Sequence, residues 1–226
     1  MNITLYGDSI LKGVVLEGGR YSAGHPWDAL AQRHGLTLDN RCRFGATAPM
    51  VVERMEKDAA REEAPGDYTL IEFGGNDCNF DWAAIAADPE GEYLPITGPK
   101  EFLCYMDRAL EIVKQAGSRP LLTTLPPIDP KKYLDWICRR GLNRENILSW
   151  LGDECAIYRF QEHYSHLLER LATREGLLCV DLREAFLQHR RLDGLLCEDG
   201  IHPNEEGHRL IAEAIREHVV QRKIEF

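Results

Sequence analysis

Three residues near the two ends of the sequence have the chemistry of a nucleophilic site. The hydroxyl of Ser9 can attack a carbonyl once a neighbouring base removes its proton. His202 has the right chemistry for that base, and Asp199, in the same Gly-containing turn, can accept the imidazole Nδ1 hydrogen. A plainer interpretation stands beside this one, because Ser9 also suits a helix cap and Asp-Gly is a common turn.

An acyl-transfer site also needs hydrogen-bond donors for the negative charge that develops on the carbonyl oxygen. The candidates are the backbone N–H of Ser9, the N–H of Gly45 and the side-chain amide of Asn76. Glycine at position 45 would let the backbone approach a substrate closely. The stretch Gly74–Asp77 is equally typical of a turn. Asp8 is a supporting candidate that either orients the Ser9 loop or caps the helix after it.

Hydrophobic patterning predicts the elements that must position these residues. Strands are expected at residues 3–6, within 36–44, and at 69–73, 120–125 and 177–181. Helices are expected at residues 26–34, 45–60, 100–115, 153–175 and 205–222. Strands that alternate with helices predict a parallel sheet covered on both faces.

The candidate residues follow the predicted strands at their carboxyl ends. Right-handed crossovers bring Ser9, Gly45 and Gly74–Asp77 to one edge of the sheet, which is where open α/β sheets bind ligands. Residues 78–98 and 128–152 start at that same edge and read as two insertions within a single domain of residues 1–226. Because both carry large aromatic side chains, we expect them to form a wall or lid over Ser9, although simple packing would also explain them.

Composition excludes several classes of partner. The formal net charge is -10, from 27 basic and 37 acidic residues, which argues against nucleic acid and anionic membranes. No apolar run is long enough for a transmembrane helix, and the first residues lack the pattern of a signal peptide. The seven cysteines are scattered without a Cys-x-x-Cys pair, so we expect free thiols and a cytoplasmic protein.

No other motif in the sequence indicates a metal site, a nucleotide-binding loop or a second type of nucleophile. His163 and His166 are three positions apart on a predicted helix, but no third His or Cys pair lies nearby in the sequence, so a structural role is favoured over a metal site. Neither Gly-x-Gly-x-x-Gly nor a P-loop occurs, and the Gly-x-Ser-x-Gly elbow of α/β-hydrolases is also missing from the sequence.

Four stretches, in order, resemble the blocks of the SGNH (GDSL-type) hydrolase family. Gly7–Ile10 is similar to the first block, with isoleucine in place of the usual leucine. Asn40 followed by Gly45 is similar to the second, Gly74–Asp77 to the third, and Asp199–Asn204 to the last. Together the blocks span nearly the whole chain, so the combination is far more specific than any single piece.

The resemblance implies a three-layer α/β/α, flavodoxin-like sandwich with a five-stranded parallel sheet. It implies a Ser9–His202–Asp199 triad and an oxyanion hole formed by Ser9, Gly45 and Asn76. It implies no metal and no organic cofactor.

The expected function is a serine esterase that hydrolyses small or medium neutral esters through an acyl-enzyme. The partner is then a small-molecule ester. An acyltransferase or an esterase of O-acetylated carbohydrates fits the same resemblance, and a non-catalytic binding protein on the same fold is the alternative from another class. Oligomeric state cannot be read from the sequence.

Overall fold

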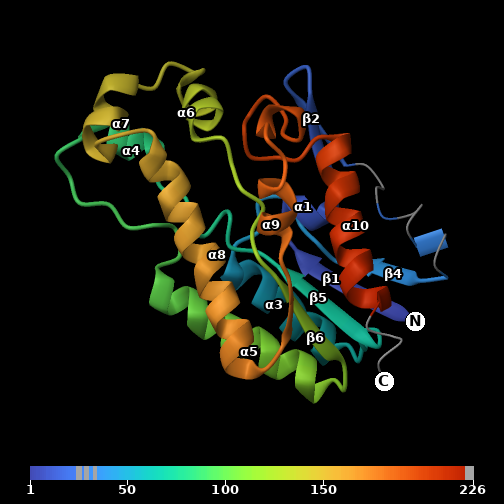
Figure 1. Cartoon of the computed structure of the whole chain (residues 1–226). Coiled ribbons are helices and arrows are strands. Elements are labelled where there is room, and N and C mark those ends of the chain that lie inside the picture. The colour runs from blue at the N-terminus through green and yellow to red at the C-terminus, as the bar shows by residue number, and fades with distance from the viewer. Residues whose placement is uncertain (24–26, 28–30, 33–34, 222–226) are drawn as a thin grey trace.

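The computed structural model describes residues 1–23, 27, 31–32 and 35–221, and its centre is a five-stranded parallel sheet (Figure 1). The strands are, in chain order, β1 (Asn2–Gly7), β4 (Thr37–Asn40), β5 (Tyr68–Glu72), β6 (Arg119–Thr123) and β7 (Leu178–Val180). Their order across the sheet is β4-β1-β5-β6-β7, and every neighbouring pair is parallel. This is the flavodoxin-like order, so the predicted fold class and its five strands are confirmed.

Helices cover both faces of this sheet. One face packs against α3 (Ala48–Ala60), α5 (Pro99–Gln115) and α8 (Cys155–Glu175), and the other against α1 (Ser9–Lys12), α9 (Leu182–Leu187) and α10 (Glu205–Gln221). Strand β1 shows why, because Ile3 and Leu5 enter one apolar cluster while Tyr6 enters the other. Most of the helix predicted at 26–34 lies outside the described residues.

The two predicted insertions form a third apolar cluster. It contains α4 (Trp82–Ala87), α6 (Pro130–Cys138), α7 (Arg144–Leu151) and the first part of α8. Figure 1 shows α4, α6 and α7 close together near one end of α8, whereas α5 lies near its other end. The ring of Trp150 packs against Phe80 and Tyr93, with centroids 5.1 and 5.8 Å away.

A β-hairpin that the sequence patterning did not predict follows α1. Its strands, β2 (Val14–Glu17) and β3 (Arg20–Ala23), are antiparallel and form a separate two-stranded sheet. The hairpin is attached to the last part of the chain, beyond a short 3-10 helix, η1 (Leu192–Gly194). Leu16 N–H donates to Cys197 Sγ (3.4 Å), and Gly19 N–H donates to Glu198 Oε1 (2.9 Å). From α10, His208 Nε2 donates to the Val14 carbonyl (2.9 Å).

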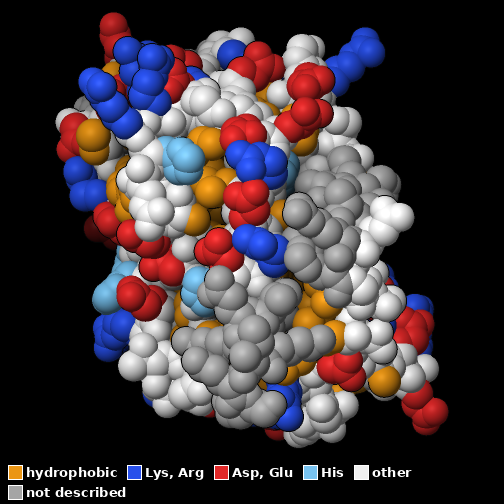
Figure 2. Space-filling view, turned by 45° about the vertical axis from the view of Figure 1, so that its right-hand side comes forward, with side chains coloured by type: hydrophobic (Ala, Val, Ile, Leu, Met, Phe, Trp, Pro, Cys, Tyr) orange, Lys and Arg blue, Asp and Glu red, His pale blue; other side chains and the backbone are white. Residues whose placement is uncertain are grey.

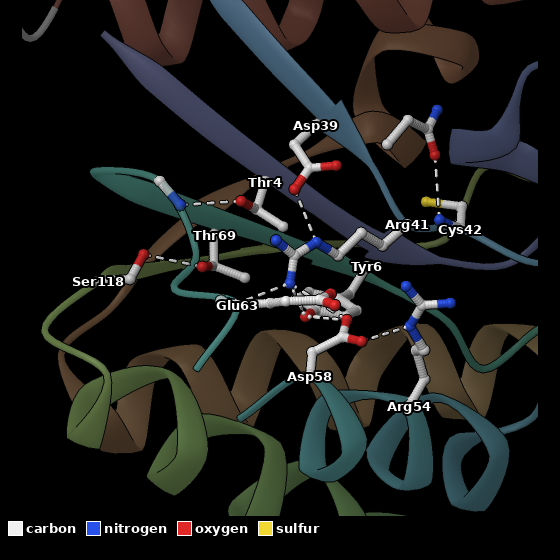
Figure 3. A network of polar contacts seen from close by, with 12 residues as sticks. Thr4, Tyr6, Asp39, Arg41, Cys42, Arg54, Asp58, Glu63, Thr69 and Ser118 are labelled. Carbon is white, nitrogen blue, oxygen red and sulfur yellow. Dashed lines mark hydrogen bonds and ion pairs between the residues drawn. The ribbon is translucent and has the colours of Figure 1, made fainter. Parts of the chain in front are cut away.

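A buried charged network fastens β1 to α3 and to the loop after β4 (Figure 3). Tyr6 Oη donates to Asp58 Oδ2 (2.8 Å), while Arg41 Nη1 donates to Tyr6 Oη (2.8 Å) and pairs with Asp58 (3.1 Å). Arg54 binds the other carboxylate oxygen at 2.7 Å. Burial alone would raise the pKa of Asp58, but the hydrogen bonds from Arg54 and Tyr6 bring that pKa below its usual value.

The surface carries mixed charge. Figure 2 shows acidic and basic side chains interspersed over one face of the molecule. All seven cysteines are free thiols, as expected. Within the described residues, none of the helices has the length and apolar character needed to cross a membrane.

We predict that Asp58→Asn lowers the free energy of unfolding by about 3 kcal/mol at pH 7, because it removes the buried carboxylate partner of Arg41 and leaves only the exposed Asp39 paired with it. The folded-state pKa of Asp58 is depressed, so its contribution is present above the unfolded value near 3.9 and is lost as the pH falls through the folded value. Urea unfolding at pH 7 and pH 3 should therefore show a difference between wild type and variant that shrinks at pH 3.

Glu56→Gln is the matched control, because Glu56 pairs with Arg108 on the exposed surface and should leave the urea midpoint almost unchanged. Equal midpoints for wild type and Asp58→Asn at pH 7 would show that the network does not stabilise the fold.

Candidate active site

Ser9, His202 and Asp199 form one hydrogen-bonded series. His202 Nε2 lies 2.9 Å from Ser9 Oγ, and His202 Nδ1 lies 2.6 Å from Asp199 Oδ2. All three side chains are buried, with exposed fractions of 6%, 4% and 0% respectively. With the imidazole hydrogen on Nδ1, His202 donates to the carboxylate and Nε2 accepts from the serine hydroxyl. The structure thus brings together residues that lie at opposite ends of the chain.

The end of β1 positions Ser9. The strand ends at Gly7, Asp8 caps α1 by accepting the Ile10 N–H (2.9 Å), and Ser9 is the first residue of that helix. Asp8 therefore acts as the cap, and the alternative in which Ser9 caps the helix does not apply. Because Ser9 is the first residue of α1, its backbone N–H has no partner within the helix.

Two buried carboxyl groups lie beneath this turn. Burial raises the pKa of Asp8 to about 6. Burial also raises the pKa of Glu72 well above its usual value, and the charge of Asp8 raises it further. Neither carboxyl oxygen of Glu72 has a hydrogen-bond partner among the described residues. Of the pair, Glu72 therefore has the stronger tendency to hold a proton, which avoids two like charges in the interior.

Donors surround the carboxylate of Asp199. Besides His202 Nδ1, the backbone N–H groups of Ile201 (3.1 Å) and His202 (3.0 Å) bind Oδ1, and Tyr21 Oη donates to Oδ2 at 3.3 Å. Burial would raise the pKa of Asp199, but the hydrogen bond and charge of His202 hold it below the usual value. Asp199 is thus an ionised carboxylate that can stabilise an imidazolium.

Aromatic rings fix the plane of the imidazole. Phe44 stacks on His202 with centroids 5.8 Å apart and planes 5° from parallel. Tyr21 meets the same ring at 5.1 Å and 60°. Sequence reasoning missed both residues, because Tyr21 belongs to the unpredicted hairpin and Phe44 lies at the end of a segment read as strand. The only sequence signal was the position of Phe44 directly before Gly45.

The turn that carries Asp199 and His202 packs directly on α6. The Asp129 N–H donates to the Gly200 carbonyl (2.8 Å), and a Cβ added at Gly200 would lie 2.7 Å from both the Asp129 carbonyl oxygen and Lys132 Cβ. Gly200 also has a φ of +72°, which disfavours other residues. The second insertion therefore supports the turn from outside the sheet.

The two other oxyanion candidates lie on neighbouring loops. Gly45, with a φ of +68°, has open space where a Cβ would lie, and it lines the same cavity as Ser9 and Asn76. Asn76 Nδ2 is 3.1 Å from Asp8 Oδ2 and 3.0 Å from the Ala46 carbonyl. Because the amide has two hydrogens, an oxyanion bound to Asn76 must share or replace one of these acceptors.

Asp77 ties these loops together. Its Oδ1 accepts the N–H of Ala48 at the start of α3 (2.8 Å), and burial raises its pKa to about 6. The loop after β5 is thereby fixed to the loop after β4, and Gly45 and Asn76 from these loops line the same cavity as Ser9.

A cavity of about 450 Å³ opens at Ser9. Its lining is mostly apolar, and both insertions contribute to it, as a wall over Ser9 requires. The lining side chains from the two insertions include Phe80, Trp82, Ile128, Tyr133, Ile137 and Leu142. Trp136 also lines it, whereas Tyr93 and Trp150 pack inside the third cluster.

The remaining histidine candidates have structural surroundings. His166 is exposed and pairs with Glu169 (3.3 Å), and His163 contacts Tyr164. His208 is buried and anchors the hairpin. In the described part of the chain, no group of three or more His, Cys, Asp and Glu side chains is arranged to hold a metal ion.

Residues 5–210 match the model of the GDSL-like Lipase/Acylhydrolase family. The chain belongs to this family. Family membership makes it an ester hydrolase of the GDSL type and confirms the resemblance seen in the sequence. Among curated protein sequences, none matches this chain significantly.

Solved structures of a lipase/acylhydrolase, an esterase and another hydrolase share the fold. A lipase/acylhydrolase from Enterococcus faecalis is 19% identical, with a TM-score of 0.62 over 98% of this chain and 96% of its own. An acetyl xylan esterase is 22% identical, with a TM-score of 0.64 over 97% and 100%. An alpha/beta hydrolase enzyme from the metagenome of Lake Arreo, Spain, is 23% identical, with a TM-score of 0.63 over 96% and 94%. At these identities the comparison shows the fold alone.

We predict that Gly200→Ala destabilises this GDSL-type hydrolase by roughly 3 kcal/mol, from the left-handed backbone conformation and the overlap with α6. Thermal or urea unfolding measures the loss. Gly194→Ala is the control, since a Cβ there meets no atom within 4 Å and should change stability little. If both variants unfold at the same denaturant concentration, α6 does not pack on the turn as described.

Proposed function

We propose that this chain hydrolyses carboxylic esters by a covalent mechanism in which Ser9 is the nucleophile, His202 the general base and Asp199 the orienting carboxylate. The series of two short hydrogen bonds from Ser9 Oγ to Asp199 Oδ2 carries the proposal. A binding module would not need a serine hydroxyl hydrogen-bonded to a base that is itself oriented by a buried carboxylate.

The reaction follows from the positions of these groups. Ser9 Oγ attacks the acyl carbonyl while its proton passes to His202 Nε2, and Asp199 stabilises the resulting imidazolium. The carbon–oxygen bond to the alcohol then breaks, and His202 returns the proton to the leaving oxygen. Water, activated by His202 in the same way, hydrolyses the acyl-enzyme and regenerates Ser9.

The proposed oxyanion hole consists of the N–H groups of Ser9 and Gly45 and the amide of Asn76. The third donor, the amide of Asn76, is hydrogen-bonded to Asp8 and to the Ala46 carbonyl. In the free enzyme these two acceptors already orient the amide, and the oxyanion would share or replace one of them.

The apolar cavity supports an uncharged acyl group of small to medium length. Its volume of about 450 Å³ exceeds what an acetyl group needs, and its lining from the insertions is aromatic and aliphatic. An acyltransferase, in which an alcohol replaces water, or an O-acetyl-carbohydrate esterase stays an alternative. The acyl-length preference separates the last of these from the proposal.

We predict that Ser9→Ala abolishes ester hydrolysis and covalent labelling by a fluorophosphonate while the circular dichroism spectrum stays that of wild type. The hydroxyl is the atom that forms the acyl-enzyme, so the expected loss is several orders of magnitude in kcat. Mass spectrometry of the labelled wild type should place the adduct on the peptide that contains Ser9. A folded Ser9→Ala protein with near-normal turnover would falsify the nucleophile assignment.

Leu142→Trp should shorten the preferred acyl chain. Leu142 lies in the loop between α6 and α7 and lines the cavity, so an indole there fills space that a longer acyl chain would occupy. We expect the ratio of kcat/KM for an octanoate ester to that for an acetate ester to fall at least about tenfold, the scale of one or two lost methylene contacts. Leu94→Trp, at an exposed position of the first insertion, is the control. An unchanged ratio would place the acyl group elsewhere.

A further inference from the structure

Two arginines stand at the opening of the cavity that holds Ser9. Arg139 and Arg140 directly follow α6, both line the cavity, and both are exposed. Within the part of the chain that the structure describes, neither forms an ion pair. The acidic residue of the nearby helix, Asp135, pairs instead with Arg144. Two positive charges are thus available at the mouth of the cavity.

Arg139 is held in place. The carbon at the centre of its guanidinium lies 3.1 Å from the centroid of the Trp136 ring, and Nη1 donates to the Trp136 carbonyl (2.8 Å). Stacking restricts the side chain and leaves other N–H groups of the planar guanidinium for a ligand. The entropy cost of ordering this arginine around an anion is therefore largely met before binding.

Contacts between rings connect this arginine to the base. The Trp136 ring meets Tyr21 edge-on at 6.3 Å, and Tyr21 in turn meets His202 at 5.1 Å. Burial and the charge of Asp199 raise the pKa of Tyr21 to about 12, and the positive charge of Arg139 opposes that rise. Arg139 therefore belongs to the side of the cavity next to His202.

That side receives the alcohol part of the ester. His202 must deliver its proton to the leaving oxygen, so in the proposed mechanism the alcohol departs next to the imidazole. A group attached to this alcohol would then lie within reach of the arginines, while the acyl group occupies the apolar part of the cavity.

The positive charges of Arg139 and Arg140 contrast with the negative charge of the chain as a whole. The chain has a formal net charge of -10, so its average field repels anions. The acidic residues that line the cavity, Asp8 and Glu72, are both buried near Ser9 and not exposed at its mouth. The positive charge at the mouth is thus not cancelled by an acidic neighbour on the surface of the cavity.

We propose that the natural substrate is an ester whose alcohol part carries an anionic group, such as a carboxylate, sulfate or phosphate, bound by Arg139 and Arg140. This inference rests on the proposed function, and it replaces the neutral ester expected from the sequence with one charged on its alcohol side. The arginines act as binding residues and take no part in bond making or breaking.

Three phenyl butyrates that differ in one para substituent test the charge preference. The substituents are sulfonate, methylsulfonyl and trimethylammonium, which give an anionic, a neutral and a cationic leaving group of similar size. For each enzyme, kcat/KM for the anionic and cationic esters is divided by that for the neutral ester at low ionic strength. Comparing these ratios between variants cancels the differences in intrinsic reactivity.

We expect the anionic-to-neutral ratio to fall about tenfold in Arg139→Gln/Arg140→Gln, the effect of losing two partly screened ion pairs, and the cationic-to-neutral ratio to rise. Raising the salt concentration to about 1 M, where the Debye length is about 3 Å, should weaken the preference of the wild type in the same direction. Arg144→Gln is the matched control. Arg144 belongs to the same insertion as Arg139 and Arg140, but it is already paired with Asp135.

Ratios within about twofold of wild type in the double variant would overturn the proposal and leave the arginines as partners of the α6 carboxyl end. An equal change in Arg144→Gln would also overturn it, because the effect would then come from net charge. Loss of the proposed function gives a different result: no turnover of the neutral ester and no fluorophosphonate label on Ser9 in the wild-type protein.

Discussion

The buried charge of Asp199 is the constraint on which the site depends. A carboxylate taken out of water costs several kcal/mol unless donors replace its hydration. Here two backbone N–H groups, an imidazole and a phenol do so, and each comes with a structural requirement. The backbone donors need the tight turn at Gly200, the turn needs α6 packed against it, and the phenol needs the hairpin β2–β3. Segments that look peripheral in Figure 1 therefore support the charge on which the base relies.

Local hydrophobic patterns explain which parts of the fold could be predicted from the sequence. Apolar runs such as residues 69–73 and the striped helix at 153–175 need no information beyond their own pattern, and strand–helix alternation then places the candidate residues on one edge. The hairpin was not predicted because its outer strand, Arg20–Ala23, is exposed throughout and has no buried face. Gly18-Gly19 is nevertheless a two-residue turn signal of the kind that joins antiparallel strands. The roles of Tyr21 and Arg139 depend on contacts between segments far apart in sequence, which no local pattern encodes.

The buried carboxyl pair shows how the oxyanion side and the nucleophile side share one support. Asp8 caps the helix that starts at Ser9 and also accepts from Asn76, so the same carboxylate positions the proposed nucleophile and one of the proposed oxyanion donors. The carboxyl group of Glu72, buried and without a hydrogen-bond partner among the described residues, is an unfavourable consequence of this arrangement, and its burial raises its pKa. Local destabilisation of this kind is common where function fixes the residue types.

The order in which the strands enter the sheet has a consequence for synthesis of the protein. Strand β1 lies inside the sheet, yet both of its neighbours, β4 and β5, come later in the chain, and the turn that carries His202 comes after all five strands. A growing chain therefore presents the proposed nucleophile first and receives the proposed base last. Until residues 199–202 have been added, the Ser9 hydroxyl has no imidazole partner, so under the proposed mechanism an incomplete chain does not hydrolyse esters even where its sheet has begun to form.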